Sequence, residues 1–199
     1  VGQVLPLGTV ALAVHWLTNT PYIVFTHGMD VLVPQRYFRK RWLLHRILRS
    51  AQHIIAASQF TADQIKQFEP AVTVTVIHPA AAITPSIIPQ TVIGVPDRFI
   101  LSVGRLVERK GFNKVIQALN NFPDLHYVIA GNGDPTNLIN QARHYGVEGR
   151  VHFFHDLTDA QIAYLYQQCL FLAMPSRQLP TGDVEGFGIV VLEAGRFGK

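Results

Sequence analysis

The sequence predicts an α/β protein made of two Rossmann-like units, each with a parallel sheet. Short apolar runs alternate with helix-like stretches along the 199 residues, which is typical of strand–helix–strand units. The runs are apolar throughout rather than at every second residue, as expected for parallel strands covered on both faces. A stretch from Pro79 to Pro96 carries four prolines and no charged residue, and it separates two series of elements. We therefore expect one unit over residues 1–80, a linker over 81–97 and a second unit over 98–199.

The first series contains three apolar or β-branched runs and two stretches with helical spacing. Ser58 and Thr61 are positioned to cap the second of the two helices. The strands are expected over Tyr22–Thr26, His53–Ala57 and Val72–Ile77, and the helices over Tyr37–Arg49 and Thr61–Phe68.

The second series repeats the alternation four times. Pro135 suits the first turn of a helix, and Thr158 suits the N-cap position before Asp159. The strands are expected over Phe99–Val103, Tyr127–Ala130, Val151–Phe154 and Leu170–Met174, and the helices over Gly111–Asn121, Pro135–Tyr145, Asp159–Gln168 and Gly188–Phe197.

The composition excludes several classes of protein. Hydrophobic residues make up 48% of the chain and charged residues 15%, which argues against disorder. The single cysteine excludes a disulfide scaffold and a thiolate metal cluster, and no His-x3-His pair is present, so we expect no metal site. The apolar run from Val4 to Leu17 is too short to span a membrane and lacks the basic start of a signal peptide. We expect a cytoplasmic protein.

Basic residues gather in the first half of the chain. Residues 1–95 carry seven lysines and arginines against three acidic residues, whereas residues 96–199 carry ten of each. The stretch Arg36–Arg49 alone holds six basic residues, no acidic residue, and the aromatic residues Tyr37, Phe38 and Trp42. Three interpretations stay open: a packed helix with a solvated basic face, contact with an anionic membrane or lipid-linked acceptor, and nucleic-acid binding.

Two cations flank the loop between the first strand and first helix of the second unit. Gly104 and Arg105 directly follow the expected strand, and Lys110 directly precedes the expected helix. Cations beside a helix N-terminus favour phosphate, which Arg binds in a bidentate manner. The alternative is a solvated basic loop.

A second polar turn follows the next strand, at Gly131-Asn132-Gly133-Asp134. It lacks the third glycine of a dinucleotide-binding fingerprint. A tight structural turn and a backbone that approaches a ligand closely are both open.

Two glutamates, Glu185 and Glu193, enclose the start of the last helix. If the segment were helical throughout, they would lie about 12 Å apart, beyond the spacing of about 5–9.5 Å between glycosidase carboxylates. This spacing fits better a single ligand that Glu185 contacts at one end and Glu193 at the other. The helix N-terminus near Gly188 would then face an anion between them. The alternative is two ordinary surface acids.

Together these motifs resemble the retaining glycosyltransferases of family 4, which have the GT-B fold of two Rossmann-like domains facing across a cleft. The resemblance rests on the order and spacing of the Gly104–Gly111 and Gly131–Asp134 segments, Pro175-Ser176, and Glu185-Gly186-Phe187-Gly188 with Glu193-Ala194. In the first unit, Thr26-His27-Gly28 and Ala57–Thr61 resemble two further signatures of that family. The Gly-Asp-Val-Glu-Gly loop at residues 182–186 is similar to a subgroup with phosphatidylinositol mannosyltransferases and bacterial polysaccharide-assembly enzymes.

The resemblance implies a site for a nucleotide-diphosphate sugar, with UDP favoured over GDP, and no cofactor or metal. Arg105 and Lys110 would hold the diphosphate after Gly104, and His27 and Glu185 would contact the donor sugar; these four charged or titratable side chains are the implied catalytic groups. Asp156 and Leu157 would lie at the nucleotide base, and Glu193 at the ribose. Backbone N–H groups of Phe187, Gly188 and Ile189 would face the sugar and phosphate. Transfer with retention would proceed by front-face attack within an ion pair.

Two departures from the family pattern bear on activity. Nothing here matches the glycine-rich loop near the start of the family's first domain, and the chain stops at Lys199, before the family's final strand and helix. We therefore expect an enzyme truncated at both ends, whose 199 residues alone need not turn over. The expected function is hexose transfer to a glycan or lipid-linked acceptor, with peripheral membrane contact through Arg36–Arg49 and no nucleic acid. A GT-B nucleotide-sugar epimerase and a nucleotide-sugar-binding module without turnover are the alternatives.

Overall fold

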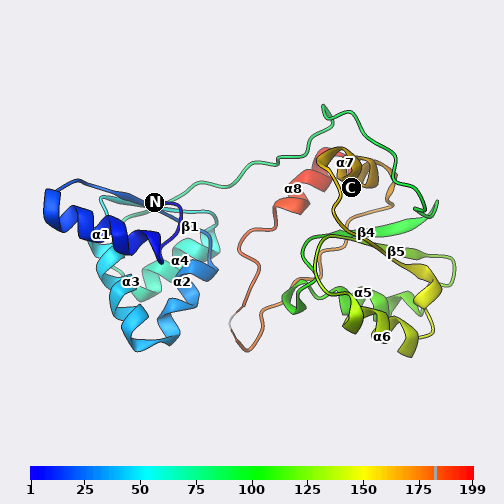
Figure 1. The fold of residues 1–199 in the computed structure, drawn as a ribbon, viewed down its shortest axis with the longest axis horizontal. Helices are drawn as coiled ribbons and strands as arrows, with labels where there is room; N and C mark the ends of the chain where they lie inside the picture. The colour runs from blue at the N-terminus through cyan, green and yellow to red at the C-terminus, as the bar shows by residue number, and fades with distance from the viewer. Residues whose placement is uncertain (182) are drawn as a thin grey trace. The chain divides into compact units, whose positions relative to one another are not determined.

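Six strands form two separate three-stranded sheets in the computed structural model (Figure 1), which describes residues 1–181 and 183–199. Each sheet belongs to one of two compact units. Unit 1 consists of Val1–Pro79 and Gln178–Phe187, and unit 2 consists of Ala80–Arg177 and Gly188–Lys199. The α/β architecture with two parallel sheets agrees with the fold predicted from the sequence.

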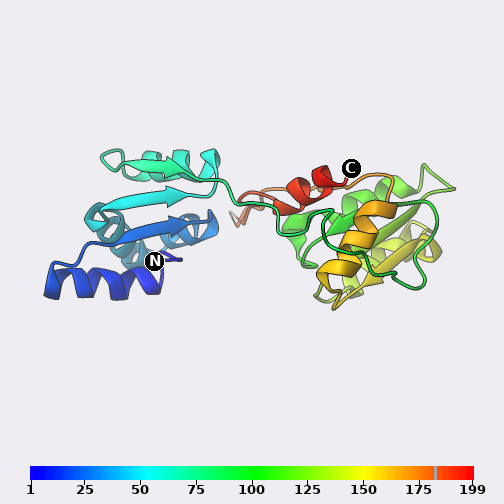
Figure 2. The same ribbon diagram turned by 90° about the horizontal axis from the view of Figure 1, so that it is seen from above.

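The sheet of unit 1 has the order β1-β2-β3, with parallel neighbours throughout. Figure 2 shows its three arrows pointing in the same direction. In the register, Ile23 lies opposite His53 and Ile54 lies opposite Val74. The three predicted strands are confirmed, each slightly shorter than expected: β1 (Ile23–Thr26), β2 (His53–Ala56) and β3 (Val74–Val76).

Four α-helices belong to the described part of unit 1, and two of them were predicted. Of the two predicted caps, Ser58 is confirmed, because its hydroxyl accepts a hydrogen bond from the backbone N–H of Thr61 over 3.2 Å, whereas Thr61 itself lies inside α4. The first helix begins after Pro6 without a side-chain cap, and its apolar sequence shows no clear helical period, which is why it was not predicted. The helices are α1 (Leu7–Thr18), α2 (Met29–Leu32), α3 (Phe38–Ser50) and α4 (Gln59–Phe68).

The core of unit 1 lies on one face of its sheet. Leu44 and Ile47 of α3 are fully buried in the same cluster as Val24 of β1. On the opposite face of β1, Ile23 is 40% exposed and Phe25 is 43% exposed. The expectation that both faces of the sheet are covered is therefore not met by the described residues of unit 1.

The sheet of unit 2 has the order β4-β5-β6 and is again parallel. The expected strand over residues 170–174 is reduced to one isolated bridge, between Leu101 and Leu172. The other strands and all four helices of this series are confirmed. They are β4 (Phe99–Val103), β5 (His126–Ala130), β6 (Val151–Phe154), α5 (Phe112–Leu119), α6 (Thr136–His144), α7 (Asp159–Gln168) and α8 (Ile189–Arg196).

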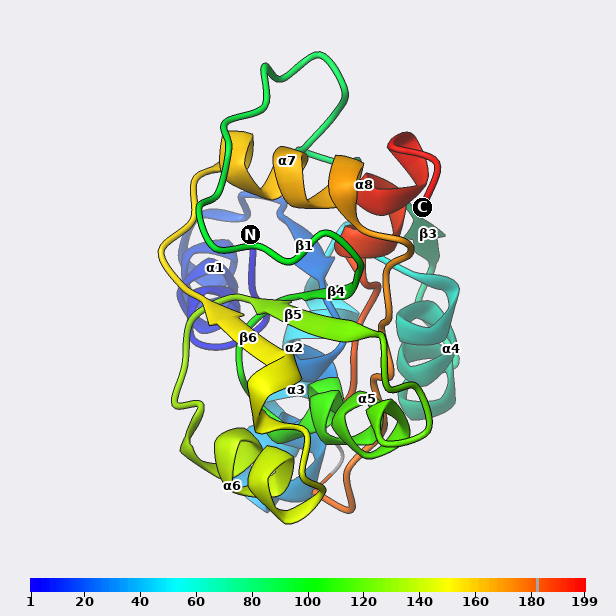
Figure 3. The same cartoon turned by 90° about the vertical axis from the view of Figure 1, so that its right-hand side faces the viewer.

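Helices cover both faces of the unit 2 sheet (Figure 3), as predicted from its uniformly apolar strands. Successive residues of β4 point to opposite faces: Leu101 packs with α7 and α8, and Ile100 packs with α5 and α6. Thr158 caps α7 in a capping box with Gln161, as its position predicted. Ile83 and Val92, from the proline-rich stretch, are buried in the α7–α8 side of this core.

Candidate functional site

Lys110 packs against Gly104, which is the first residue after β4. Gly104 has φ +144°, and a Cβ built on it would lie 3.0 Å from Cε and 3.2 Å from Nζ of Lys110. Lys110 ends the 3-10 helix Glu108–Lys110 and is only 7% exposed. The missing side chain at Gly104 therefore makes room for the Lys110 ammonium at the carboxyl edge of the sheet, where ligands of such sheets bind.

The Gly131–Asp134 turn packs directly on this loop. A side chain at Gly131 would collide with the carbonyl oxygen of Gly104, and one at Gly133 would lie 2.8 Å from Cβ of Leu106. The backbone N–H of Leu106 donates to the carbonyl oxygen of Asn132 over 2.9 Å. The two glycines thus allow two main chains to touch, which is the structural role considered for this turn.

A hollow of about 270 Å³ opens at the same edge. Its walls come from the ends of β4 and β5 and from the loop between β6 and α7. Among the residues of unit 2 predicted to bind a donor, four line this hollow: Gly104, Arg105, Asp156 and Leu157. Gly131 and Asn132 line it as well, so the turn also meets any ligand held there.

Asp156 is held in a special backbone conformation. Its φ of +53° is left-handed, which few residues other than Gly, Asn and Asp adopt. Its Oδ1 accepts from Nδ2 of Asn132 over 2.8 Å, and its backbone N–H donates to Oδ1 of Asn132 over 2.9 Å. Hydrogen bonds from His155 and then Asn132 lower the pKa of Asp156. An ionised acceptor therefore faces the hollow, and Asn132 is its partner, a pairing that no sequence pattern predicted.

Glu193 lies inside the core of unit 2 rather than on the surface of α8. It is 6% exposed, and its Oε2 accepts from the Tyr166 hydroxyl over 3.0 Å. Its Oε1 accepts from the backbone N–H of Ile83 over 3.4 Å. Gly188, with φ +81°, precedes the first residue of α8, Ile189, which is 40% exposed. The interpretation of Glu193 as an ordinary surface acid is therefore wrong.

The remaining predicted residues belong to unit 1. His27 is exposed at the end of β1, and its backbone N–H donates to Oδ1 of Asp30 over 2.9 Å. Burial raises the pKa of Asp30, although the hydrogen bond from His27 opposes this effect. The Gly186 Cα lies 3.5 Å from the position of a Cβ on Gly28, so the part of the 178–187 segment around Gly186 lies beside His27 and Gly28.

That segment carries two further predicted residues. Phe187 stacks on the ring of His78, with 5.3 Å between ring centroids, and Glu185 is partly buried. Of the Gly-Asp-Val-Glu-Gly loop, Gly182 lies outside the described residues. Across residues 1–181 and 183–199, no three His, Cys, Asp or Glu side chains gather in a group that could hold a metal ion.

Comparison with known families assigns both parts of the chain. Residues 84–199 match the family described as glycosyl transferases group 1, and residues 2–83 match the one described as glycosyltransferase family 4. None of the helices described here is both long and apolar enough to cross a membrane.

Three individual proteins illustrate the similarity. The O-antigen biosynthesis glycosyltransferase WclY of Escherichia coli is 39% identical over 107 residues, which cover 52% of this chain and 28% of that protein. An uncharacterised glycosyltransferase of Methanocaldococcus jannaschii is 25% identical over 94% of this chain and 50% of its own length. The crystal structure of Anabaena HepE in complex with UDP and glucose has a TM-score of 0.77 at 23% identity, over 96% of this chain and 55% of that one.

The chain thus spans half or less of the length of these two curated relatives. The family match covers more than half of the chain, and HepE shares its fold over 96% of the chain. The chain belongs to the glycosyl transferases group 1 family and has the GT-B fold.

Proposed function

We propose that the protein transfers a hexose from a nucleotide-diphosphate sugar to a glycan or lipid-linked acceptor, with retention of the anomeric configuration. The observation that carries the proposal is the buried Lys110 packed over Gly104, beside the hollow that Arg105 lines. A buried ammonium at the carboxyl edge of a parallel sheet is suited to a diphosphate. UDP is favoured as the nucleotide because HepE, a protein of the same fold, binds it.

The chemistry assigned to this edge is charge stabilisation. As the bond between sugar and diphosphate breaks, negative charge develops on the leaving oxygen. Arg105 and Lys110 would stabilise it from fixed positions, without a metal ion. The nucleophile would then be the acceptor hydroxyl, attacking from the same face as the departing diphosphate, whose leaving oxygen would take up the hydroxyl proton. His27 and Glu185 would contact the sugar.

The nucleoside would occupy the hollow. Asp156 and Leu157 would face the base, and Glu193 would accept hydrogen bonds from the ribose. A carboxylate offers about four acceptor positions. Tyr166 and the Ile83 N–H use two of them, which leaves capacity for two hydroxyls. The backbone N–H groups at Phe187, Gly188 and Ile189 would face the sugar and phosphate.

Calorimetric titration of UDP and GDP tests the donor site. Arg105→Ala and Lys110→Ala should each weaken binding about tenfold or more, because each removes a charge-assisted contact of about 1.5–3 kcal/mol. Lys114→Ala is the matched control, since Lys114 is an exposed lysine of the same unit. Binding that is unchanged in both site variants would contradict the phosphate assignment.

Product analysis tests the reaction. Incubation with UDP-hexose in the absence of an acceptor separates a transferase from a nucleotide-sugar epimerase, because an epimerase changes the sugar unaided. With a glycan acceptor present, the anomeric proton coupling of the product reports retention. Tight UDP binding without transfer would instead identify a binding module.

The acceptor side of the proposal concerns unit 1. WclY is named for O-antigen biosynthesis, and for this protein we propose a glycan or lipid-linked acceptor. The basic stretch Arg36–Arg49 would then contact the inner, anionic face of a membrane peripherally from the cytoplasm.

A further inference from the structure

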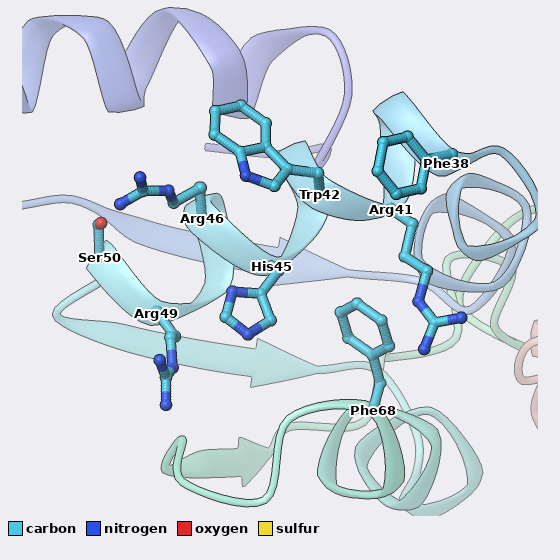
Figure 4. Close-up of a pocket in the computed structure, with 8 residues that line it drawn as sticks. All are labelled: Phe38, Arg41, Trp42, His45, Arg46, Arg49, Ser50 and Phe68. Atoms are coloured by element: carbon cyan, nitrogen blue, oxygen red, sulfur yellow. The ribbon is translucent and has the colours of Figure 1, made fainter.

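A groove of about 640 Å³ lies along α3 of unit 1, with Phe68 of α4 on one side (Figure 4). The figure shows Arg41, His45 and Arg49 along α3 on the side that Phe68 of α4 faces, with Trp42 and Arg46 on the other rim. We call this feature the α3–α4 groove. Its main lining residues are Phe38, Arg41, Trp42, His45, Arg46 and Phe68.

Two of the groove's basic side chains, His45 and Arg49, share one buried carboxylate. Glu69, only 4% exposed, follows the last residue of α4. Its Oε2 lies 2.7 Å from Nε2 of His45, and its Oε1 accepts from Nε of Arg49 over 3.1 Å. This carboxylate ties α3 to the end of α4 and holds the floor of the groove in place.

The other two arginines lie over aromatic rings instead of carboxylates. The Arg41 guanidinium is 5.6 Å from the centre of the Phe68 ring, and that of Arg46 is 5.3 Å from the centre of the Trp42 ring. Neither forms an ion pair with any residue that the structure describes. A guanidinium stacked on a ring keeps its N–H edge for a phosphate, and the stacking reduces the freedom lost on binding.

Apolar side chains stand exposed beside these cations. Phe38 is 88% exposed and Trp42 is 53% exposed, and α3 contains no acidic residue. Aromatic residues next to arginines on a helix without acids are typical of an interfacial helix, whose apolar side chains enter the boundary between headgroups and acyl chains.

We propose that the α3–α4 groove is the docking site for an anionic phospholipid bilayer. Arg41 and Arg46 bind lipid phosphate esters, while Phe38 and Trp42 enter the interface. The inference rests on the peripheral membrane contact proposed above and deepens it, because it assigns binding to a built groove rather than to the net charge of Arg36–Arg49. Charge complementarity selects this occupant: two unneutralised guanidinium groups meet a surface of phosphate esters.

Vesicle binding of the full chain tests the proposal. We compare phosphatidylcholine vesicles with vesicles that also contain phosphatidylglycerol. The groove variant is Arg41→Gln/Arg46→Gln, and the matched variant is Arg36→Gln/Arg39→Gln, which removes the same charge from exposed positions outside the groove. The groove variant should lose at least about tenfold more affinity for the anionic vesicles than the matched variant, because surface charge alone affects both equally.

A second measurement follows the aromatic residues. In a Trp16→Phe background, Trp42 is the remaining tryptophan, and its fluorescence should shift to the blue on anionic vesicles. Phe38→Ala should weaken vesicle binding, whereas Phe60→Ala, at an exposed aromatic residue of α4 outside the groove, should not. Circular dichroism melting of every variant checks that unit 1 remains folded.

The outcomes separate the two levels of the proposal. If the wild type binds no vesicles, the groove and the membrane contact both fail, while the UDP titration still stands on its own. If both double variants lose affinity equally, the groove fails and the membrane contact holds. Tighter binding to a single-stranded oligonucleotide than to vesicles, with the same loss in the groove variant, would assign the groove to nucleic acid instead.

Discussion

The Tyr166 hydroxyl donates a hydrogen bond to Oε2 of Glu193 over 3.0 Å, and this bond joins α7 to α8 inside unit 2. Burial, followed by the nearby Glu193 charge, raises the pKa of Tyr166, so its hydroxyl keeps its proton throughout the physiological range. The buried carboxylate is therefore held by a donor that does not titrate, with the Ile83 N–H as a second donor.

Removal of this donor should destabilise unit 2. Tyr166→Phe leaves one oxygen of a buried carboxylate without its partner, which we expect to lower the free energy of unfolding by about 1–3 kcal/mol. Urea denaturation followed by circular dichroism measures the change. Tyr164→Phe is the matched control, because Tyr164 lies on the same helix and is only partly buried. Equal losses in the two variants would show that the hydrogen bond to Glu193 contributes nothing specific.

A methyl group at Gly104 should displace the Lys110 ammonium. Gly104→Ala places a carbon about 3 Å from Cε and Nζ of Lys110, so we expect UDP affinity to fall about 10- to 150-fold as one charge-assisted contact of about 1.5–3 kcal/mol is lost. Calorimetry measures the affinity. Gly146→Ala shares the positive φ but has nothing within 4 Å, and it should bind UDP normally. If Gly104→Ala bound UDP with wild-type affinity, the assignment of Lys110 as a phosphate contact would be contradicted.

The amide of Asn132 should position Asp156 for the nucleotide. Asn132→Ala removes both hydrogen bonds to Asp156, and because both residues are exposed, the stability should change by less than about 1 kcal/mol. Nucleotide affinity should nevertheless fall several-fold. Asn137→Ala breaks a comparable exposed amide hydrogen bond, to Gln141, and serves as the control. A variant that loses stability but not affinity would assign Asn132 to folding alone.

Acid should destabilise unit 2 through a histidine pair. Nδ1 of His126 lies 2.9 Å from Nε2 of His152, a hydrogen bond that requires one of the two nitrogens to lack a hydrogen. Burial, followed by the proximity of His126, lowers the pKa of His152. The unfolded chain therefore binds more protons than the folded one, and stability falls as the pH drops through the ordinary histidine pKa of about 6.5.

The matched experiment compares thermal unfolding at about pH 7.5 and about pH 5.5, on either side of that value. The wild type should lose more stability on acidification than His152→Gln, which has no imidazole to protonate. His144→Gln, at an exposed histidine, should behave like the wild type. The pair would be irrelevant if His152→Gln and the wild type lost the same amount.

Unit 2 was predictable almost to the residue because its local signals are strong. β4 and β6 are apolar runs with polar or glycine boundaries, and α7 begins at a capping box on Thr158. α1 carries no such signal, since it is apolar and begins without a side-chain cap. The segment around Leu172 pairs with β4 through only one bridge, to Leu101. Three residues later, the carbonyl oxygen of Pro175 packs closely against Gly111. Apolar composition does not reveal this tertiary contact.

Residues of the candidate site that directly follow a strand could be picked out from the sequence. Hydrogen-bonded pairs between residues far apart in the chain could not. Arg105 and Asp156 were identified by their positions after β4 and β6. Asn132 and Tyr166 were not identified as partners, because their contacts to Asp156 and Glu193 span 24 and 27 residues of chain. Such pairings depend on how the helices and loops of unit 2 pack, so they cannot be predicted from the spacing of residues along the chain.

The close approaches at Gly104, Gly111 and Gly131 have a consequence for how the fold can diversify. At each of these positions an added side chain would meet Lys110 or the main chain of a neighbouring loop. The rim of the proposed phosphate site is therefore a junction in which main-chain contacts, rather than interchangeable side chains, set the geometry. Descendants of this chain could exchange the side chains at positions 105, 156 and 157, the proposed donor contacts, while the loops that present them kept their paths.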